Sequence, residues 1–189
     1  AVNAGVLAAS STARDWANIV SPTQVPGPSQ SIGCYTNGCL AGAAALPING
    51  PGYQVMRLSR KRYYGHPDLL GFIQRLGQFA WEQKRGSLLI GDLGQPRGGP
   101  TLSGHRSHQT GLDVDIWFLL SREADNRLLS ANERETWNAP SVVDMQNKTV
   151  DSRRWSTNMA NILEAAARRP EVDRIFVNPS IKQALCKAK

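Results

Sequence analysis

The 189-residue sequence contains no long apolar run. No stretch reaches the roughly 18 consecutive apolar residues that a membrane-spanning helix needs, which excludes a membrane span. There is also no internal repeat and no run of Lys and Arg interleaved with aromatic residues, so the common nucleic-acid-binding motifs are excluded. The net charge of +7 favours acidic partners, such as nucleic acid, an anionic membrane surface or an anionic cell wall, without choosing among them.

Cysteine is also scarce, with Cys34, Cys39 and Cys186 as its three occurrences. An odd count in an exported protein implies an unpaired thiol or a partner outside this sequence. Export is suggested by the first thirteen residues, AVNAGVLAASSTA, which are small and apolar and end like the cleavage region of a secretory signal. We therefore expect residues 1–13 to be the remnant of a signal peptide and residues 14–189 to form one domain. A disordered Ala/Ser tail is the alternative.

The first half of the chain shows clear periodic patterns. Residues 21–51 are rich in Pro, Gly, Ser and Asn, which indicates an extended, turn-rich segment on the surface. Residues 53–58 have the character of a short strand. A helix is predicted to begin at Pro67 and to stop at Gly86. Its core-facing residues recur at three- and four-residue steps: Leu69, Phe72, Ile73, Leu76 and Phe79.

The middle of the chain combines a buried strand, a long loop and an alternating segment. Residues 87–93 (SLLIGDL) read as a buried strand, and residues 94–111 contain too many glycines and prolines for regular structure. Apolar and polar residues alternate over 112–120, which predicts a strand carrying Asp113 and Asp115 on the same face. Two carboxylates should therefore lie beside the preceding loop.

The last third of the chain mixes helix and strand signals. Residues 121–154 are polar and indicate an irregular excursion with short helical pieces, and residues 157–169 have helical periodicity. A strand is predicted over 172–178 and another helix from Ser180 onward. Because the order lacks a regular βαβ alternation, we expect an α+β fold in which helices and long irregular loops surround a small central antiparallel sheet.

The residues that indicate chemistry gather between Ser103 and Asp115. His105 and His108 lie on a loop bounded by glycines, directly before the segment that presents Asp115. Histidine nitrogen and aspartate oxygen are good ligands for Zn²⁺. A histidine and an aspartate at this spacing also occur by chance, so the clustering of the histidines carries the metal-site hypothesis. The third histidine, His66, precedes the predicted helix and is assigned to a loop or a helix cap.

At these residues the sequence resembles the penicillin-insensitive murein endopeptidases. These are zinc peptidases related to lysostaphin, to D-Ala-D-Ala metallopeptidases and to the hedgehog signalling domain. The most specific segment is SGHRSHQTGLDVDI, and the resemblance extends to QSIGCYTNGC, YQVMR, KRYYGHPDL, FIQRL, LIGD and RIFVNPSIKQALC. It covers essentially the whole chain after the first thirteen residues.

The resemblance implies that His108 and Asp115 ligate a zinc ion and that His105 is a further metal contact. Asp113 would contact one of these ligands and orient it without binding the metal itself. The equal alternative is that Asp113 is a surface carboxylate that caps the end of a strand. The family also has a His-x-His motif that supplies the last zinc ligand and the general base, and the 189 residues contain none. We therefore expect a C-terminally truncated peptidase domain, inactive or weakly metal-binding alone, with its general base beyond Lys189.

The resemblance also implies a substrate and a location. The expected reaction is hydrolysis of the D-alanyl-diaminopimelate cross-link of peptidoglycan in the periplasm of a Gram-negative bacterium. It needs no serine nucleophile for β-lactams to acylate. Disulfide partners of Cys39 and Cys186 would lie outside this sequence, and Cys34 would be additional. The alternatives are a D,D-carboxypeptidase or dipeptidase of the same superfamily, and a peptidoglycan-binding module without catalysis.

Overall fold

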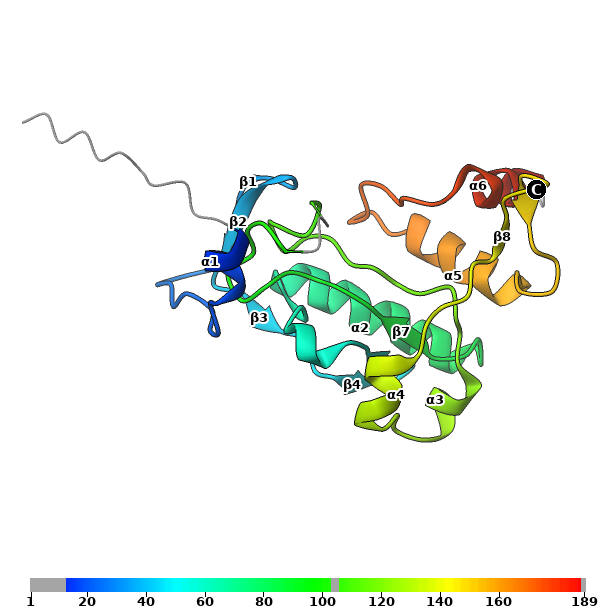
Figure 1. Cartoon of the computed structure of the whole chain (residues 1–189), viewed down its shortest axis with the longest axis horizontal. Coiled ribbons are helices and arrows are strands. Elements are labelled where there is room, and N and C mark those ends of the chain that lie inside the picture. Colours follow the sequence, from blue (N-terminus) through cyan, green and yellow to red (C-terminus); the bar gives the residue numbers. More distant parts are fainter. Residues whose placement is uncertain (1–12, 103–105, 188–189) are drawn as a thin grey trace, which may run out of the picture. The chain divides into compact units, whose positions relative to one another are not determined.

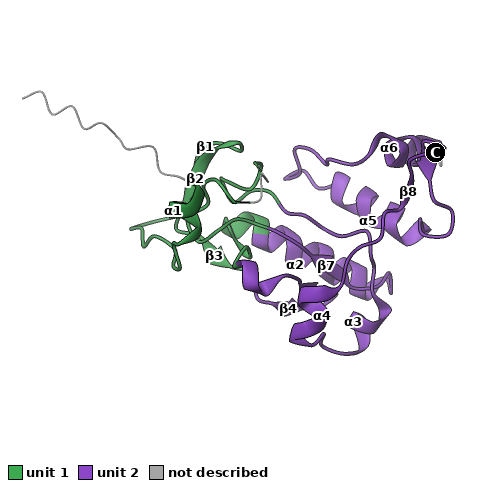
Figure 2. Cartoon of the chain, in the orientation of Figure 1, with its two compact units in different colours: residues 1–46, 61–69, 93–113 green, residues 47–60, 70–92, 114–189 purple. Residues whose placement is uncertain are grey.

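The computed structural model describes residues 13–102 and 106–187 (Figure 1). Residues 1–12 of the predicted signal remnant, and also His105, lie outside the described residues. The chain divides into two compact units (Figure 2). Unit 1 comprises residues 1–46, 61–69 and 93–113, and unit 2 comprises residues 47–60, 70–92 and 114–189.

Unit 1 contains a β-hairpin, a second strand pair and a short helix. The hairpin joins β1 (Gln30–Cys34) to β2 (Asn37–Ala41), and β3 (Ala44–Ala45) pairs with β6 (Tyr64–Gly65); both pairs are antiparallel. The helix α1 (Ala13–Ala17) precedes them in the chain. Every residue of β1 is exposed. Most of the predicted turn-rich segment, residues 21–51, thus lies at the surface, whereas Leu40 and Leu46 within it are each 1% exposed.

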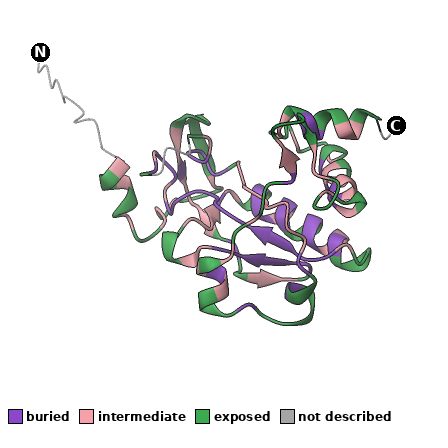
Figure 3. Ribbon diagram, turned by 45° about the vertical axis from the view of Figure 1, so that its right-hand side comes forward, coloured by how far each residue is buried: buried purple, intermediate pink, exposed green. Residues whose placement is uncertain are grey.

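Unit 2 is organised around a three-stranded sheet with the order β4-β5-β7. β4 (Asn49–Gly50) is antiparallel to β5 (Tyr53–Val55), whereas β5 is parallel to β7 (Leu88–Ile90). All residues of β5 and β7 are buried (Figure 3), which was predicted for β7. The sheet is mixed rather than wholly antiparallel, because a long helix lies between β5 and β7 in the chain and provides the crossover that a parallel pair requires.

That helix, α2 (Pro67–Glu82), forms where the sequence predicted it. Proline is favoured at the first helical position, where its missing N–H has no intrahelical partner to lose. The apolar stripe is buried, with Ile73 and Leu76 at 0% and 1% exposure. The main-chain N–H of Asp68 donates to Nδ1 of His66 at 3.2 Å. The predicted cap role of His66 is therefore confirmed.

Unit 2 also contains several short elements. A 3-10 turn over Leu58–Arg60 precedes β7 in the chain, and the others follow it. The two helices α3 (Arg122–Asn126) and α4 (Ala131–Thr136) are the short helical pieces predicted for this part of the chain. Two further strands, β8 (Val143–Asp144) and β9 (Thr149–Val150), form an antiparallel hairpin that the sequence did not predict.

The last two helices of the described chain contribute side chains to a hydrophobic cluster in unit 2. α5 (Thr157–Ala167) begins after Ser156, whose hydroxyl oxygen accepts the Met159 N–H, and α6 (Pro179–Lys187) follows. The centre of the cluster is formed by the buried side chains of Val142, Met159 and Ile181. Both helices agree with the sequence patterns. No helix among residues 13–102 and 106–187 has the length and apolar character to cross a membrane.

The α+β class is confirmed, and two predicted strands need correction. Residues 172–178 form no strand, because this apolar segment pairs with no neighbouring strand, and its Phe176 is 69% exposed. Residues 112–120 also form no continuous strand. Their pairing with β7 consists of one isolated antiparallel bridge, between Ile90 and Ile116.

Candidate functional site

Hydrogen bonds within unit 1 fix the last residues of the loop of residues 94–111. The Gln109 side-chain amide donates to the Thr36 carbonyl oxygen at 2.9 Å and accepts the Gly38 N–H at 3.2 Å. The Ser31 hydroxyl donates to the Thr110 carbonyl oxygen at 2.8 Å. These contacts join the loop to the β1–β2 hairpin. The two residues that directly follow His108 are thereby held in place.

A close backbone approach explains one of the glycines in this loop. Gly98 has a φ of +65°, and a Cβ atom there would lie 1.9 Å from the Gln109 carbonyl oxygen. No side chain fits at that distance, and the positive φ is itself unfavourable for other residues. The glycine therefore allows the start and the end of the loop to pack against each other, with the Gly99 N–H donating to the Gln109 carbonyl oxygen at 3.0 Å.

Among the predicted site residues that the structure describes, His108 is the most deeply buried, with 2% exposure. Its Nδ1 lies 3.3 Å from the main-chain oxygen of Asp113 and 3.7 Å from the Asp113 carboxylate. A proton on Nδ1 can therefore be donated to the main-chain oxygen of Asp113. Metal-bound histidines usually donate a hydrogen bond from the ring nitrogen that does not bind the metal, because this bond fixes the tautomer of the ring.

Asp115 is fixed through its main chain at the end of β7, within unit 2. Its N–H donates to the Asp92 carbonyl oxygen at 2.9 Å, and its own carbonyl oxygen accepts the Gly91 N–H at 2.7 Å. A Cβ on Gly91 would lie 2.8 Å from the indole nitrogen of Trp117, so glycine permits this close pairing. The backbone that carries the predicted carboxylate ligand is thus anchored to the most buried strand of unit 2.

Sequence reasoning missed the side chain of Asp92 in this region. Its carboxylate is 2% exposed and pairs with Arg60, with Nη1 lying 3.1 Å from Oδ2. A buried carboxylate without a cation nearby would be strongly unfavourable, so Arg60 stabilises the segment that receives Asp115. The signal was present in the sequence as a single aspartate that ends the apolar run LLIGD.

The structure thus brings Asp113 together with His108 in unit 1, and it describes Asp115 within unit 2. His105 lies outside the described residues. In the part of the chain that the structure does describe, no three His, Cys, Asp or Glu side chains form a cluster that could hold a metal ion. Cys34, Cys39 and Cys186 are free thiols. The predicted disulfides to partners outside the sequence remain predictions.

The donor set fits a zinc ion chemically. Zinc binds neutral imidazole nitrogen and carboxylate oxygen, and if Nδ1 of His108 donates to Asp113, Nε2 would be the nitrogen of that ring able to coordinate. The Asp113 side chain is 30% exposed and its carboxylate lies 3.7 Å from Nδ1 of that ring, where its negative charge would make the imidazole a stronger ligand.

Comparison with known proteins shows which family this sequence matches. The sequence profile described as penicillin-insensitive murein endopeptidase matches residues 31–189. Proteins named penicillin-insensitive murein endopeptidase from Salmonella paratyphi C (strain RKS4594), Salmonella newport (strain SL254) and Salmonella agona (strain SL483) are each 47% identical over 183 residues. Each alignment covers 96% of this chain and 64% of the relative. The chain therefore spans about 64% of the length of these curated relatives.

Proposed function

The chain belongs to the penicillin-insensitive murein endopeptidase family, a family of metallopeptidases, and from this premise we propose that it acts in zinc-dependent hydrolysis of peptidoglycan cross-links. The bond cleaved is the one between D-alanine and diaminopimelate of neighbouring stem peptides. The observation that supports this function is the buried His108, whose Nδ1 lies 3.3 Å from the main-chain oxygen of Asp113, a contact that metal-binding histidines commonly make.

The proposed zinc ligands are His108 and Asp115, with His105 as a further contact. When bound, zinc polarises the scissile carbonyl and lowers the pKa of a coordinated water to about 7. Asp113 keeps the His108 proton on Nδ1 and fixes the orientation of the ring. The main-chain bonds from Asp92 and Gly91 hold Asp115 in place. The general base is not assigned among the 189 residues, since the family's His-x-His motif is not among them.

This chemistry accounts for insensitivity to penicillin. A β-lactam inactivates an enzyme by acylating a nucleophilic serine, and a metallopeptidase uses water in place of such a serine. We propose a periplasmic location, because peptidoglycan lies there and because residues 1–13 resemble the end of a secretory signal. The net charge of +7 suits an anionic wall polymer.

The test is cleavage of a purified cross-linked muropeptide dimer. Two proteins are compared, namely the 189-residue chain and a chimera in which the C-terminal segment of a Salmonella relative follows Lys189. We expect the chimera to release monomers, to be inhibited by a zinc chelator and to be unaffected by penicillin. Trimming of D-alanine from monomers without cleavage of dimers would instead identify a D,D-carboxypeptidase. Binding of muropeptides with neither activity would identify a non-catalytic module.

Substitutions then connect the activity to the proposed ligands. His108→Ala and Asp115→Asn should abolish chelator-sensitive cleavage in the chimera. The matched control is His66→Asn, because His66 caps α2 and asparagine retains a side-chain acceptor at that position. Full activity of the His108→Ala protein would contradict the proposed zinc site.

A further inference from the structure

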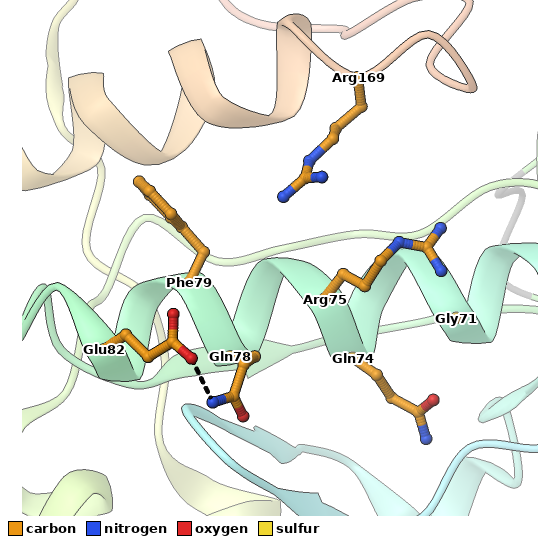
Figure 4. Close-up of a pocket in the computed structure, with 7 residues that line it drawn as sticks. All are labelled: Gly71, Gln74, Arg75, Gln78, Phe79, Glu82 and Arg169. Atoms are coloured by element: carbon orange, nitrogen blue, oxygen red, sulfur yellow. Dashed lines mark hydrogen bonds between the residues drawn. The ribbon is translucent and has the colours of Figure 1, made fainter.

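A hollow lies along one face of α2 in unit 2, and no residue that lines it is a proposed zinc ligand (Figure 4). Its volume is about 470 Å³, which is in the range of small-ligand sites. Side chains of α2 line one side, and Arg169, in the turn that follows α5, lines the other. Figure 4 shows Phe79 and Arg169 both extending into the space between these two segments.

Arg75 and Arg169 line this hollow, and both interact with the carboxylate of Glu171. Arg75 donates to Glu171 at 2.9 Å, and Arg169 also acts electrostatically on Glu171. The pKa of Glu171 is lowered by a hydrogen bond from its own main chain and by Arg75, so this carboxylate stays ionised at neutral pH. Two positive charges against one negative charge leave an excess of one positive charge at this end of the hollow.

The arginines are positioned by the local structure. The Arg75 side chain folds back along α2 over Gly71, where a Cβ would lie 3.0 Å from the guanidinium. The Arg169 main chain is fixed in a turn by its N–H bond to the Ala166 carbonyl oxygen and by the bond that its own carbonyl oxygen accepts from Val172. The Arg75 side chain is still 53% exposed, so its remaining donors are open to a ligand.

The other end of the hollow has the opposite charge. Glu82 lies two helical turns beyond Arg75, about 10 Å along the helix axis. Its carboxylate accepts a hydrogen bond from the Gln78 side chain at 2.7 Å. The ring of Phe79 lies on the same face of the helix between the two ends (Figure 4). The surface therefore suits a short peptide that has a free carboxylate, an aliphatic middle and an amino group.

We propose that the α2 hollow, lined by Arg75, Phe79, Glu82 and Arg169, binds a free carboxylate of the peptidoglycan stem peptide. This inference rests on the proposed function for the identity of the peptide. The two arginines bind the carboxylate, and the hollow holds the wall polymer through a contact that takes no part in bond cleavage. Arginine is suited to this task because its planar donors match a carboxylate.

The test is a calorimetric or NMR titration of the 189-residue chain with an uncross-linked tetrapeptide stem, which offers no cross-link to cleave. Arg75→Gln and Arg169→Gln should each weaken binding about three- to tenfold, the range expected for partly exposed charge pairs. Arg168→Gln is the matched control, because Arg168 pairs with Glu164 and does not line the hollow. The same peptide with its carboxylates amidated should bind the unaltered protein as weakly as the arginine variants bind the free acid.

Glu171→Gln separates ligand binding from a purely structural role. If the arginines bind a carboxylate, removing the competing charge of Glu171 should tighten binding. If the Arg75–Glu171 pair only holds the two segments together, Glu171→Gln should weaken binding as Arg75→Gln does, and that result would overturn the proposal. Unchanged affinity in both Arg75→Gln and Arg169→Gln would overturn it as well. Neither outcome depends on cross-link cleavage, so a failure here is distinguishable from a failure of the proposed function.

Discussion

The buried guanidinium of Arg134 leads to the most quantitative prediction from this structure. Arg134 is only 4% exposed and lies on α4, where it donates five hydrogen bonds. Its partners are the main-chain oxygens of Leu129 (3.2 Å), Val55 (2.6 Å) and Ile48 (3.3 Å) and the side-chain oxygens of Asn49 (2.5 Å) and Gln54 (2.7 Å). Burial lowers the pKa of Arg134, yet an arginine remains charged at neutral pH.

These bonds connect α4 to the central sheet of unit 2. Gln54 on β5 accepts the Leu129 N–H at 2.9 Å and donates to the carbonyl oxygens of Ala124 and Arg127. Arg134→Met keeps most of the side-chain volume and removes every donor. Each buried acceptor left without a partner costs about 1–3 kcal/mol, and Val55 and Leu129 are 0% and 4% exposed. Two such acceptors together cost ~2–6 kcal/mol.

The assay is urea denaturation monitored by tryptophan fluorescence. Trp117 and Trp137 report on this region because they pack against a hydrophobic cluster formed by Met56, Leu89, Ala124 and Leu129. We expect Arg134→Met to lower the free energy of unfolding by ~2–6 kcal/mol, and Arg134→Lys to lower it less because lysine retains charge and some donors. Arg153→Met is the control, since its side chain is 92% exposed and the change should be within about 0.5 kcal/mol. A loss below about 1 kcal/mol for Arg134→Met would refute the network argument.

Three further predictions follow from the site, a helix cap and the loop. Asp113→Asn should reduce zinc affinity about tenfold, measured by competition with a chromophoric chelator, and unchanged affinity would show that the carboxylate does not support His108. The pKa of Glu133 is lowered to about 2 by hydrogen bonds from Arg127 and then from the Ser130 main chain. This depressed pKa stabilises the fold above pH 4.5, and the stabilisation is lost as the pH falls from 4.5 toward about 2. Acid denaturation should therefore be shallower in Glu133→Gln than in the unaltered chain, and parallel pH curves would contradict this. Gly98→Ala should destabilise unit 1 by more than ~1 kcal/mol in thermal unfolding, because the added Cβ meets the Gln109 carbonyl oxygen, and an unchanged midpoint would disprove the close approach.

Short-range sequence patterns predicted those elements whose formation depends mainly on neighbouring residues, such as α2. The proline that starts α2 and the buried stripe through Ile73 and Leu76 specify that helix without reference to the rest of the chain. Residues 172–178 show the limit of such reasoning. Their apolar and β-branched side chains fit a strand, but a strand requires a partner, and pairing is a property of the tertiary fold.

The candidate site was predicted to a similar extent. The sequence indicates that His108, Asp113 and Asp115 share a region, because they lie close together in the chain. It does not show that Nδ1 of His108 faces Asp113. The Gln109 contact with Thr36 joins positions 73 residues apart and is invisible to a local pattern. The ion pair between Arg60 and Asp92 was missed for the same reason.

The central claim is that His108 and Asp115 hold a zinc ion. The most direct test is the zinc content of the chimera that continues beyond Lys189, measured by elemental analysis for the unaltered protein, His108→Ala, Asp115→Asn and the His66→Asn control. We expect about one zinc per chain in the unaltered protein and in the His66→Asn control, and little zinc in His108→Ala and Asp115→Asn. Full zinc content in His108→Ala and Asp115→Asn would contradict it.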